Sequence, residues 1–226
     1  MEVSVIVERV RAAIDELMDN GTSFLGASED AQNLVGVIKD KIPYALEWVL
    51  VNAPVELLDV AGVTGADTYV SGTFEIDANT QVATAKLSDD VLRVVSARLS
   101  SWTYSPVPVT EHSVEYLMQS DETARGSWDR PVTAIVHKIT AGSDNSLVSG
   151  KWLELYCAKA TTDTLSVLAY KKPDLSGMVD STDIDISAAL EGAFIYHIAG
   201  LTLLAFRDAA AKDMLEVARQ YLVHSL

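Results

Sequence analysis

The sequence predicts an α+β protein in which helices from both chain ends form a bundle and a β-rich antiparallel region is inserted between them. Apolar residues recur at helical spacing through the first 60 residues, and a region rich in valine, threonine, tyrosine and glycine follows. The proline-free stretch Ile186–Leu222 then returns to helical spacing. We therefore expect a helical bundle domain from residues 1–60 and 185–226, and an inserted β-rich region over residues 61–184.

The first predicted helix carries one apolar face and should end at Asn20-Gly21, because glycine adopts the left-handed capping conformation without steric cost. The face consists of Val3, Ile6, Val7, Val10, Ala13, Ile14 and Leu17. A single helix cannot bury such a face alone. The C-terminal helices are the expected partner.

A second helical pattern begins near Ser28–Asp30 and should end at Pro54. Pro43 interrupts it, since proline disfavours helical geometry in the residue before it but suits the first position of a helix. Two helices over Glu29–Lys41 and Pro43–Asn52, or one kinked helix, agree equally well with the pattern. Its apolar positions are Leu34, Val37, Ile38, Ile42, Leu46 and Val49.

The middle of the chain predicts short antiparallel strands joined by polar turns. Thr73–Ile76 and Gln81–Leu87 predict a hairpin, and Val91–Trp102 predicts the longest strand. Further elements are a helical turn at Ser113–Gln119 and strands at Pro131–Ile139, Lys151–Cys157 and Asp163–Tyr170, of which the last two should form a hairpin through Lys159–Thr162. Polar loops are expected at Gly62–Gly72, Ala141–Gly150 and Pro173–Asp183.

The C-terminal stretch predicts a buried central helix, a break at Phe206–Asp208, and an amphipathic helix packed back beside the first. The central stripe is Leu190, Phe194, Ile198, Leu201 and Ala205, and the second stripe is Ala210, Met214, Val217, Ala218, Tyr221 and Leu222. The apolar run Gly192–Phe206 is about 15 residues long and carries His197, whereas a membrane-spanning helix needs about 20 apolar residues. A core helix is therefore expected.

The charge of the chain argues against binding to nucleic acid phosphates. The 226 residues include 32 acidic and 17 basic side chains, giving a formal net charge of -15 that is spread along the chain. The first residues carry charges every few positions and have no hydrophobic signal region, so we expect synthesis in a cytoplasm and no membrane. The single cysteine, Cys157, excludes an internal disulfide and a cysteine-rich metal site.

The sequence predicts no catalytic, cofactor-binding or metal-binding residues. His112, His137, His197 and His224 are too far apart for a local metal motif, and strand alternation places Cys157 on a core face with Leu153 and Leu155. Gly142–Lys151 has the wrong spacing for a phosphate-binding loop. Asp180–Asp185 lacks the glycine and glutamate of an EF-hand loop, so helix capping by Asp185 or Ser187 is the favoured role. Asp89-Asp90 is expected to form a turn.

Several segments resemble bacteriophage head-to-tail connector (adaptor) proteins of short-tailed phages. Leu87-Ser88-Asp89-Asp90-Val91-Leu92-Arg93, running on to Trp102, resembles their turn-then-strand element. Arg130-Pro131-Val132, the strand Lys151–Cys157 and the helix pair Ala189–Ala218 are similar to ring proteins of the crAss-like phages. The resemblance covers most of the chain by order of elements, although each motif is short.

The resemblance implies a structural virion protein without enzymatic activity or cofactor, located at the head–tail junction. Twelve identical subunits would form a ring by head-to-tail contacts, join the portal protein to tail and ring proteins, and continue the DNA ejection channel. Genome DNA would contact the protein only while it passes through the channel, because an acidic channel wall repels the DNA phosphates. The alternatives are a small-ligand-binding protein or enzyme with a site assembled from distant residues, for example around His137 and Cys157, and a cell-surface or scaffolding module.

Overall fold

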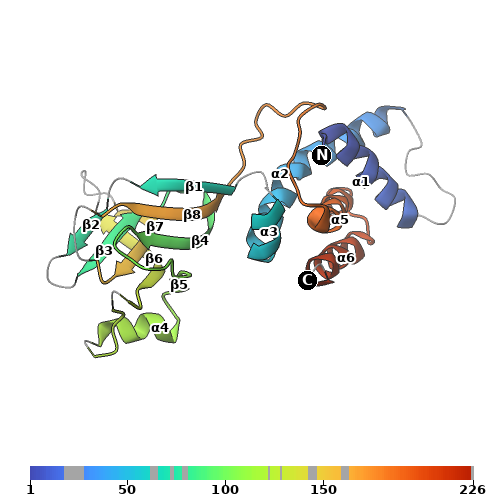
Figure 1. Cartoon of the computed structure of the whole chain (residues 1–226). Helices are drawn as coiled ribbons and strands as arrows, with labels where there is room; N and C mark the ends of the chain where they lie inside the picture. The colour runs from blue at the N-terminus through green and yellow to red at the C-terminus, as the bar shows by residue number, and fades with distance from the viewer. Residues whose placement is uncertain are drawn as a thin grey trace. The chain divides into compact units, whose positions relative to one another are not determined.

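The computed structural model shows a mixed α+β protein, as the sequence predicts. The chain divides into two compact units, a helical unit of residues 1–65 and 172–226 and a β unit of residues 66–171 (Figure 1). Residues 172–184, expected in the inserted region, thus lie with the helices. The structure describes residues 1–17, 28–61, 66–71, 74–77, 81–121, 123–127, 129–141, 147–158 and 163–224.

The helical unit contains the helices that periodicity predicts and one more. Pro43 lies inside a single continuous helix, which decides between the two alternatives. A short helix that the sequence analysis missed follows Pro54, and the expected stop at Asn20-Gly21 lies outside the described residues. The helices are α1 (Val3–Leu17), α2 (Ser28–Asn52), α3 (Val55–Ala61), α5 (Ala188–Ala205) and α6 (Ala211–His224).

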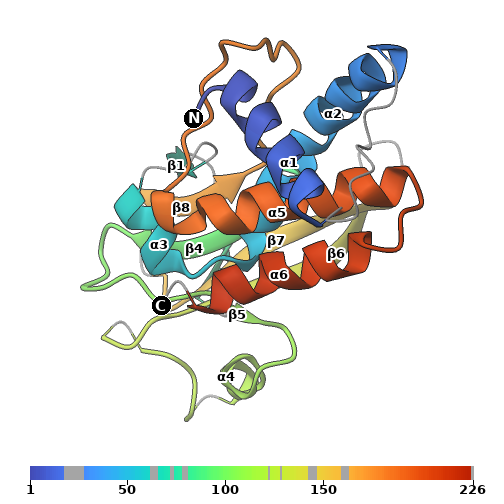
Figure 2. The ribbon, with the colours of Figure 1, turned by 90° about the vertical axis from the view of Figure 1, so that its right-hand side faces the viewer.

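Helix α5 is the centre of this unit, because it contacts α1, α2, α3 and α6. The predicted break is confirmed: α5 ends at Ala205, Arg207 adopts a positive φ of 59°, and Asp208 Oδ1 accepts a hydrogen bond from Ala210 N just before α6. Figure 2 shows α5 and α6 side by side. By length and composition α5 could span a membrane, but 56% of it is buried within the protein, as in a core helix.

The segment after the β unit is tied to the helices by ion pairs. Lys172 Nζ lies 2.9 Å from Glu47 Oε1, and Lys39 Nζ lies 2.5 Å from Asp180 Oδ1. The predicted capping role of Ser187 is confirmed, since its side chain accepts a hydrogen bond from Ala189 N at the start of α5. The acidic stretch Asp180–Asp185 is therefore held to α2 by the ion pair of Asp180 with Lys39, and it leads into the central helix α5.

The β unit consists of two sheets, one with strand order β1-β8-β4 and one with order β2-β3-β7-β6-β5. A short helix α4 (Val114–Leu117) and a 3-10 turn η1 (Met118–Ser120) lie in the connection between β5 and β6, where a helical turn is predicted. The strands are β1 (Ala66–Ser71), β2 (Glu75–Asp77), β3 (Val82–Lys86), β4 (Val91–Leu99), β5 (Val109–Thr110), β6 (Val132–Ala141), β7 (Leu147–Tyr156) and β8 (Leu165–Lys171).

The predicted hairpin of β2 and β3 is confirmed, but the predicted hairpin of β7 and β8 is wrong. β7 pairs with β3 and β6, whereas β8 pairs with β1 and β4 in the other sheet. The chain therefore passes from one sheet to the other after β7, and the predicted turn Lys159–Thr162 lies outside the described residues. The longer of its two pairings is with β6, which runs antiparallel to β7 over ten residue pairs.

Other expectations for this region also need correction. The predicted loop Ala141–Gly150 contains the start of β7, and the predicted loop Gly62–Gly72 contains β1. β6 and β7 have ten residues each and exceed the nine of β4, which was expected to be longest. β5 pairs with β6 in parallel, so the strands are not all antiparallel. Asp89-Asp90 forms the predicted turn before β4.

The core of the β unit contains apolar residues from both sheets. Leu153 and Leu155 of β7 and Ala83 and Ala85 of β3 form one buried cluster with residues of β4 and β8 and with Trp102. Alternation then places Glu154 and Tyr156 on the opposite face of the five-stranded sheet. That second face is also partly covered, and the candidate site lies there.

Candidate functional site

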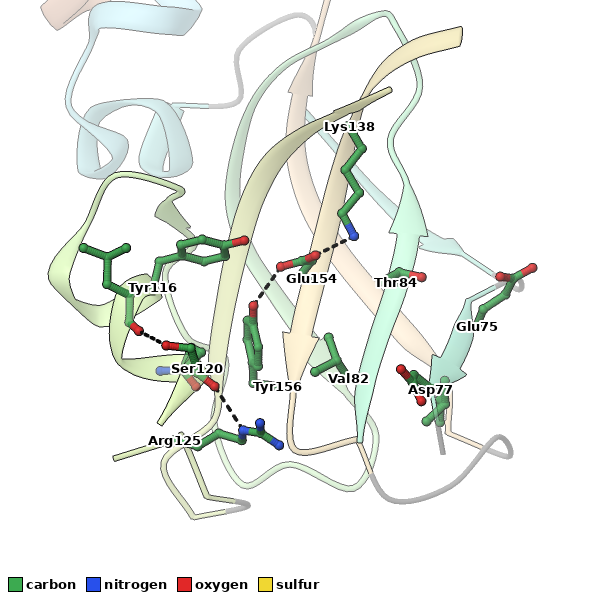
Figure 3. A pocket seen from close by; sticks show the side chains of 13 residues that line it. Glu75, Asp77, Val82, Thr84, Tyr116, Ser120, Arg125, Lys138, Glu154 and Tyr156 are labelled. Carbon is green, nitrogen blue, oxygen red and sulfur yellow. Dashed lines mark hydrogen bonds and ion pairs between the residues drawn. The ribbon is translucent and has the colours of Figure 1, made fainter. Parts of the chain in front are cut away.

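A cavity that contains several charged side chains and two tyrosines lies on the second face of the five-stranded sheet, beside α4 and η1 (Figure 3). A small apolar cluster of Ala134, Val136 and Tyr156, with Tyr116 and Trp152 packed against it, covers part of this face. The cavity measures about 540 Å³. Its lining residues are Glu75, Ile76, Asp77, Val82, Thr84, Tyr116, Leu117, Gln119, Ser120, Arg125, Lys138, Glu154 and Tyr156.

Glu154 is the buried acid of this cavity, with a side chain only 9% exposed. Its Oε1 lies 2.5 Å from Lys138 Nζ, and its Oε2 accepts a hydrogen bond of 2.8 Å from the Tyr156 hydroxyl. In Figure 3 the carboxylate lies between these two side chains. A buried carboxylate needs such partners, because burying an unpaired charge is far more costly than burying a paired one.

Two tyrosines adjoin the carboxylate. The rings of Tyr116 and Tyr156 meet edge to face, with centroids 6.4 Å apart and planes at 75°. Burial, together with the hydrogen bond to Glu154 and its charge, raises the pKa of Tyr156 well above its usual value. Burial and then the charge of Glu154 also raise the pKa of Tyr116. Both hydroxyls therefore stay protonated near neutral pH, and that of Tyr156 remains a donor to the carboxylate.

Gln119 fixes the loop that closes one end of the cavity. Its side chain is buried, its Nε2 donates to Glu115 O at 2.7 Å, and its Oε1 accepts from Gly126 N at 2.9 Å. Arg125 Nε donates to the Gln119 carbonyl at 3.1 Å. A Cβ at Gly126 would lie 3.0 Å from the Arg130 carbonyl oxygen, so this position is closely packed. The loop thus presents Arg125 to the cavity from a fixed backbone.

Cys157 does not lie in the core as predicted. The residue is only partly buried, has a positive φ of 73°, and its thiol donates to the Gly126 carbonyl oxygen. β7 ends at Tyr156, so the alternation that placed Cys157 beside Leu155 no longer applies one residue later. The thiol instead helps to hold the loop that contains Gly126.

The structure does not bring His137 and Cys157 together. His137 is exposed and pairs in register with Lys151, whereas Tyr156, the residue before Cys157, pairs with Val132. His112 is also exposed, and no side-chain position is described for His224. Within the described ranges, no group of three or more His, Cys, Asp or Glu side chains is placed to hold a metal ion.

His197 is a partly buried histidine of the helical unit, remote in sequence from the cavity. Its ring stacks on Trp48, with centroids 4.0 Å apart and planes 6° from parallel. Its Nδ1 is buried and has no hydrogen-bond partner among the described residues. Burial, with a smaller contribution from the positive charge of Arg219, lowers the pKa of His197 to about 4. This histidine packs as a neutral ring.

Sequence reasoning missed the cavity because its residues come from distant segments. Lys138 lies on β6, Glu154 and Tyr156 lie on β7, and Tyr116 lies on α4. One local signal was present: in Trp152–Tyr156 the acid Glu154 shares a strand face with two aromatic residues. An acid on an otherwise apolar strand face indicates a buried carboxylate in need of a partner.

Comparison of the chain with models of known protein families gives no match, and comparison with curated proteins gives none either.

Proposed function

We propose that the chain is a structural virion protein, a subunit of the connector ring that joins the portal to the tail of a short-tailed bacteriophage. The observation that carries the proposal is the order of the units: segments from both chain ends make one helical unit, and a single β unit is inserted between them. The same order, with the motifs at Leu87–Arg93 and Lys151–Cys157, underlies the resemblance to connector proteins.

In this proposal α1, α2, α5 and α6 form a bundle that serves as the framework of each subunit. α5 contacts all three of the others, and Leu190, Phe194 and Ile198 are fully buried on it. A helix packed against several neighbours at once gives a rigid framework. The β unit, with its own core, is then free to serve as a docking module for neighbouring copies.

The proposed assembly is a closed ring of twelve copies held by head-to-tail contacts, with portal and tail proteins on its two sides. The formal net charge of -15 supports this role, because an acidic channel wall repels DNA phosphates and lets the genome slide past. Partners, location in the virion and the lack of enzymatic activity all follow from this one proposal.

Electron microscopy of the purified protein, alone and mixed with the portal protein, tests the proposal. We expect rings of identical subunits with twelvefold symmetry, stacked coaxially on the portal when it is present. A protein that stays monomeric even with portal and tail proteins present would overturn it. Native mass spectrometry gives the subunit number independently of image symmetry.

One observation favours a second function, a protein that binds a small ligand. The cavity around Glu154 gathers a buried carboxylate, a lysine and two tyrosines from β6, β7 and α4. Ligand cavities typically measure about 300–1,000 Å³, and this one is about 540 Å³.

A further inference from the structure

We propose that the cavity of the β unit binds an organic cation, an alkylammonium or guanidinium group that takes the place of Lys138 beside Glu154. Lys138 itself shows that the cavity accepts this chemistry, because its alkyl chain ends in an ammonium group 2.5 Å from the carboxylate. The site does not depend on the connector proposal, and either one can fail without the other.

Lys138 can leave the carboxylate at modest cost. Its side chain is 36% exposed, and Lys138 pairs in register with Gly150, four residues before Glu154 on β7. The ammonium group therefore reaches Glu154 by extending along the sheet from a partly solvated position. A lysine that withdraws regains water around its charge, whereas the buried carboxylate cannot do so and must find another cation.

The surroundings of Glu154 remain in place when Lys138 withdraws. The Tyr156 hydroxyl still donates to Oε2 at 2.8 Å, and Thr84, the cross-strand neighbour of Glu154 on β3, also lines the cavity. The free Oε1 would then be the acceptor for an incoming N–H group. A carboxylate held this way is preorganised for a charged donor.

The walls and rim also favour a positive ligand. The rings of Tyr116 and Tyr156 stand beside the carboxylate, and aromatic rings attract ammonium and guanidinium groups through their electron-rich faces. Glu75 and Asp77 add two carboxylates to the lining, and Arg125 is its second cation. With Lys138 withdrawn, the lining would hold three acidic side chains and one basic side chain, a formal charge of −2.

Two sources of such a cation are possible, a free amine or a lysine or arginine side chain of a partner protein. The exposed apolar residues Val114, Leu117 and Met118 lie on α4 and at the start of η1, and Leu117 lines the cavity. Apolar residues flanking the basic side chain of a protein partner would gain contact with them. A free amine would not.

Titration of the whole protein with butylammonium chloride, followed by the ring signals of Tyr116 and Tyr156 in NMR spectra, tests the site. We expect saturable shifts in the wild type and binding about tenfold tighter in Lys138→Met, where the internal competitor is gone. Glu154→Gln should show no saturable shift. Sodium chloride at equal ionic strength controls for screening, and Lys86→Met, which changes an exposed lysine outside the lining, should bind like the wild type.

A leucine-flanked lysine peptide with blocked ends distinguishes the two sources. Tighter binding of this peptide than of butylammonium supports a protein partner, and equal binding supports a free amine. If Lys138→Met folds only when butylammonium is present, the site is supported. No saturable shift in the wild type, no gain in Lys138→Met, or unchanged binding in Glu154→Gln would overturn the proposal.

Discussion

The Tyr156 hydroxyl donates a hydrogen bond of 2.8 Å to Glu154 Oε2, joining two side chains on the same face of β7. Strand alternation places residues two apart on one face, so the local backbone brings these groups together. The consequence is long-range, because the same carboxylate pairs with Lys138 on β6. Glu154 therefore joins β6 to β7 through its ion pair with Lys138, and both side chains line the cavity.

Removing the tyrosine hydroxyl should destabilise the β unit. In Tyr156→Phe the buried Glu154 loses the hydrogen bond to its Oε2, and an unsatisfied buried polar group costs about 1–3 kcal/mol. Hydrogen exchange of the backbone amides of β6 and β7 measures the change in local stability. Tyr104→Phe is the control, since it removes the hydroxyl of an exposed tyrosine of the β unit that does not line the cavity. Equal exchange in both variants would contradict the role given to the Tyr156–Glu154 bond.

Substituting Gly200 by alanine should destabilise the packing of α5 against α6. An added Cβ would lie 2.7 Å from Leu215 Cγ and Cδ2 and 3.2 Å from the Ala211 carbonyl oxygen. Overpacking of this kind typically costs about 1–3 kcal/mol, which exceeds the gain of about 1 kcal/mol in helix propensity. Urea denaturation followed by far-UV circular dichroism should show a lower midpoint for Gly200→Ala.

Gly36 provides the control for this prediction. It lies in α2, and within the part of the chain that the structure describes no atom beyond the neighbouring backbone of its own helix lies within 4 Å of a Cβ added there. Gly36→Ala should therefore raise the stability of the helical unit by up to about 1 kcal/mol, because alanine is the better helix former. A shift of the same sign in both variants would show that close packing at Gly200 does not limit the contact of α5 with α6.

The helices could be predicted because their signals are local. α1 and α6 each carry one apolar stripe, α5 is apolar on nearly all sides, and the stripe fails where the chain turns at Phe206–Asp208. Buried Met214 and Ala218 belong to the stripe predicted for α6. Helix periodicity depends on residues three and four apart, so it needs no knowledge of the partner.

The strand partners could not be predicted in the same way. A short polar turn after β7 is typical of a hairpin, yet β8 belongs to the other sheet. The pairing of β7 depends on the burial of both its faces. Leu153 and Leu155 lie in the core on one face, and Glu154 lines the cavity beside α4 and η1 on the other. Both faces depend on segments far away in the sequence, and so does the cavity itself.

The stability of the helical unit should fall as the pH drops from about 6.5 toward 4 because of His197. Burial lowers its pKa to about 4 in the folded protein, against about 6.5 in the unfolded chain. As the pH falls, the unfolded chain therefore binds a proton at His197 before the folded protein does. The contribution of neutral His197 to the free energy of unfolding is fully present above pH 6.5 and is lost as the pH falls toward 4. Because the ring keeps part of its contact with water, we expect a loss of about 1–2 kcal/mol.

The measurement is the urea midpoint of the helical unit at several pH values, for the wild type and for His197→Phe. Phenylalanine keeps a ring for stacking on Trp48 and has no proton to bind, so its midpoint should depend less on pH over this range. His112→Gln changes an exposed histidine and should behave like the wild type. Parallel pH profiles for the wild type and His197→Phe would show that His197 contributes nothing to the pH dependence.

Removing the side chain of Gln119 should open the loop beside the cavity to protease. Its amide donates to Glu115 O and accepts from Gly126 N, so the substitution takes a hydrogen-bond partner from each of these two backbone groups. We expect trypsin to cleave after Arg125 about tenfold faster in Gln119→Ala than in the wild type, because local opening becomes more frequent. Ser120→Ala, which alters an exposed side chain next to it, is the control. Equal cleavage of the two variants would mean that other contacts, such as that of the Cys157 thiol with Gly126 O, hold the loop closed.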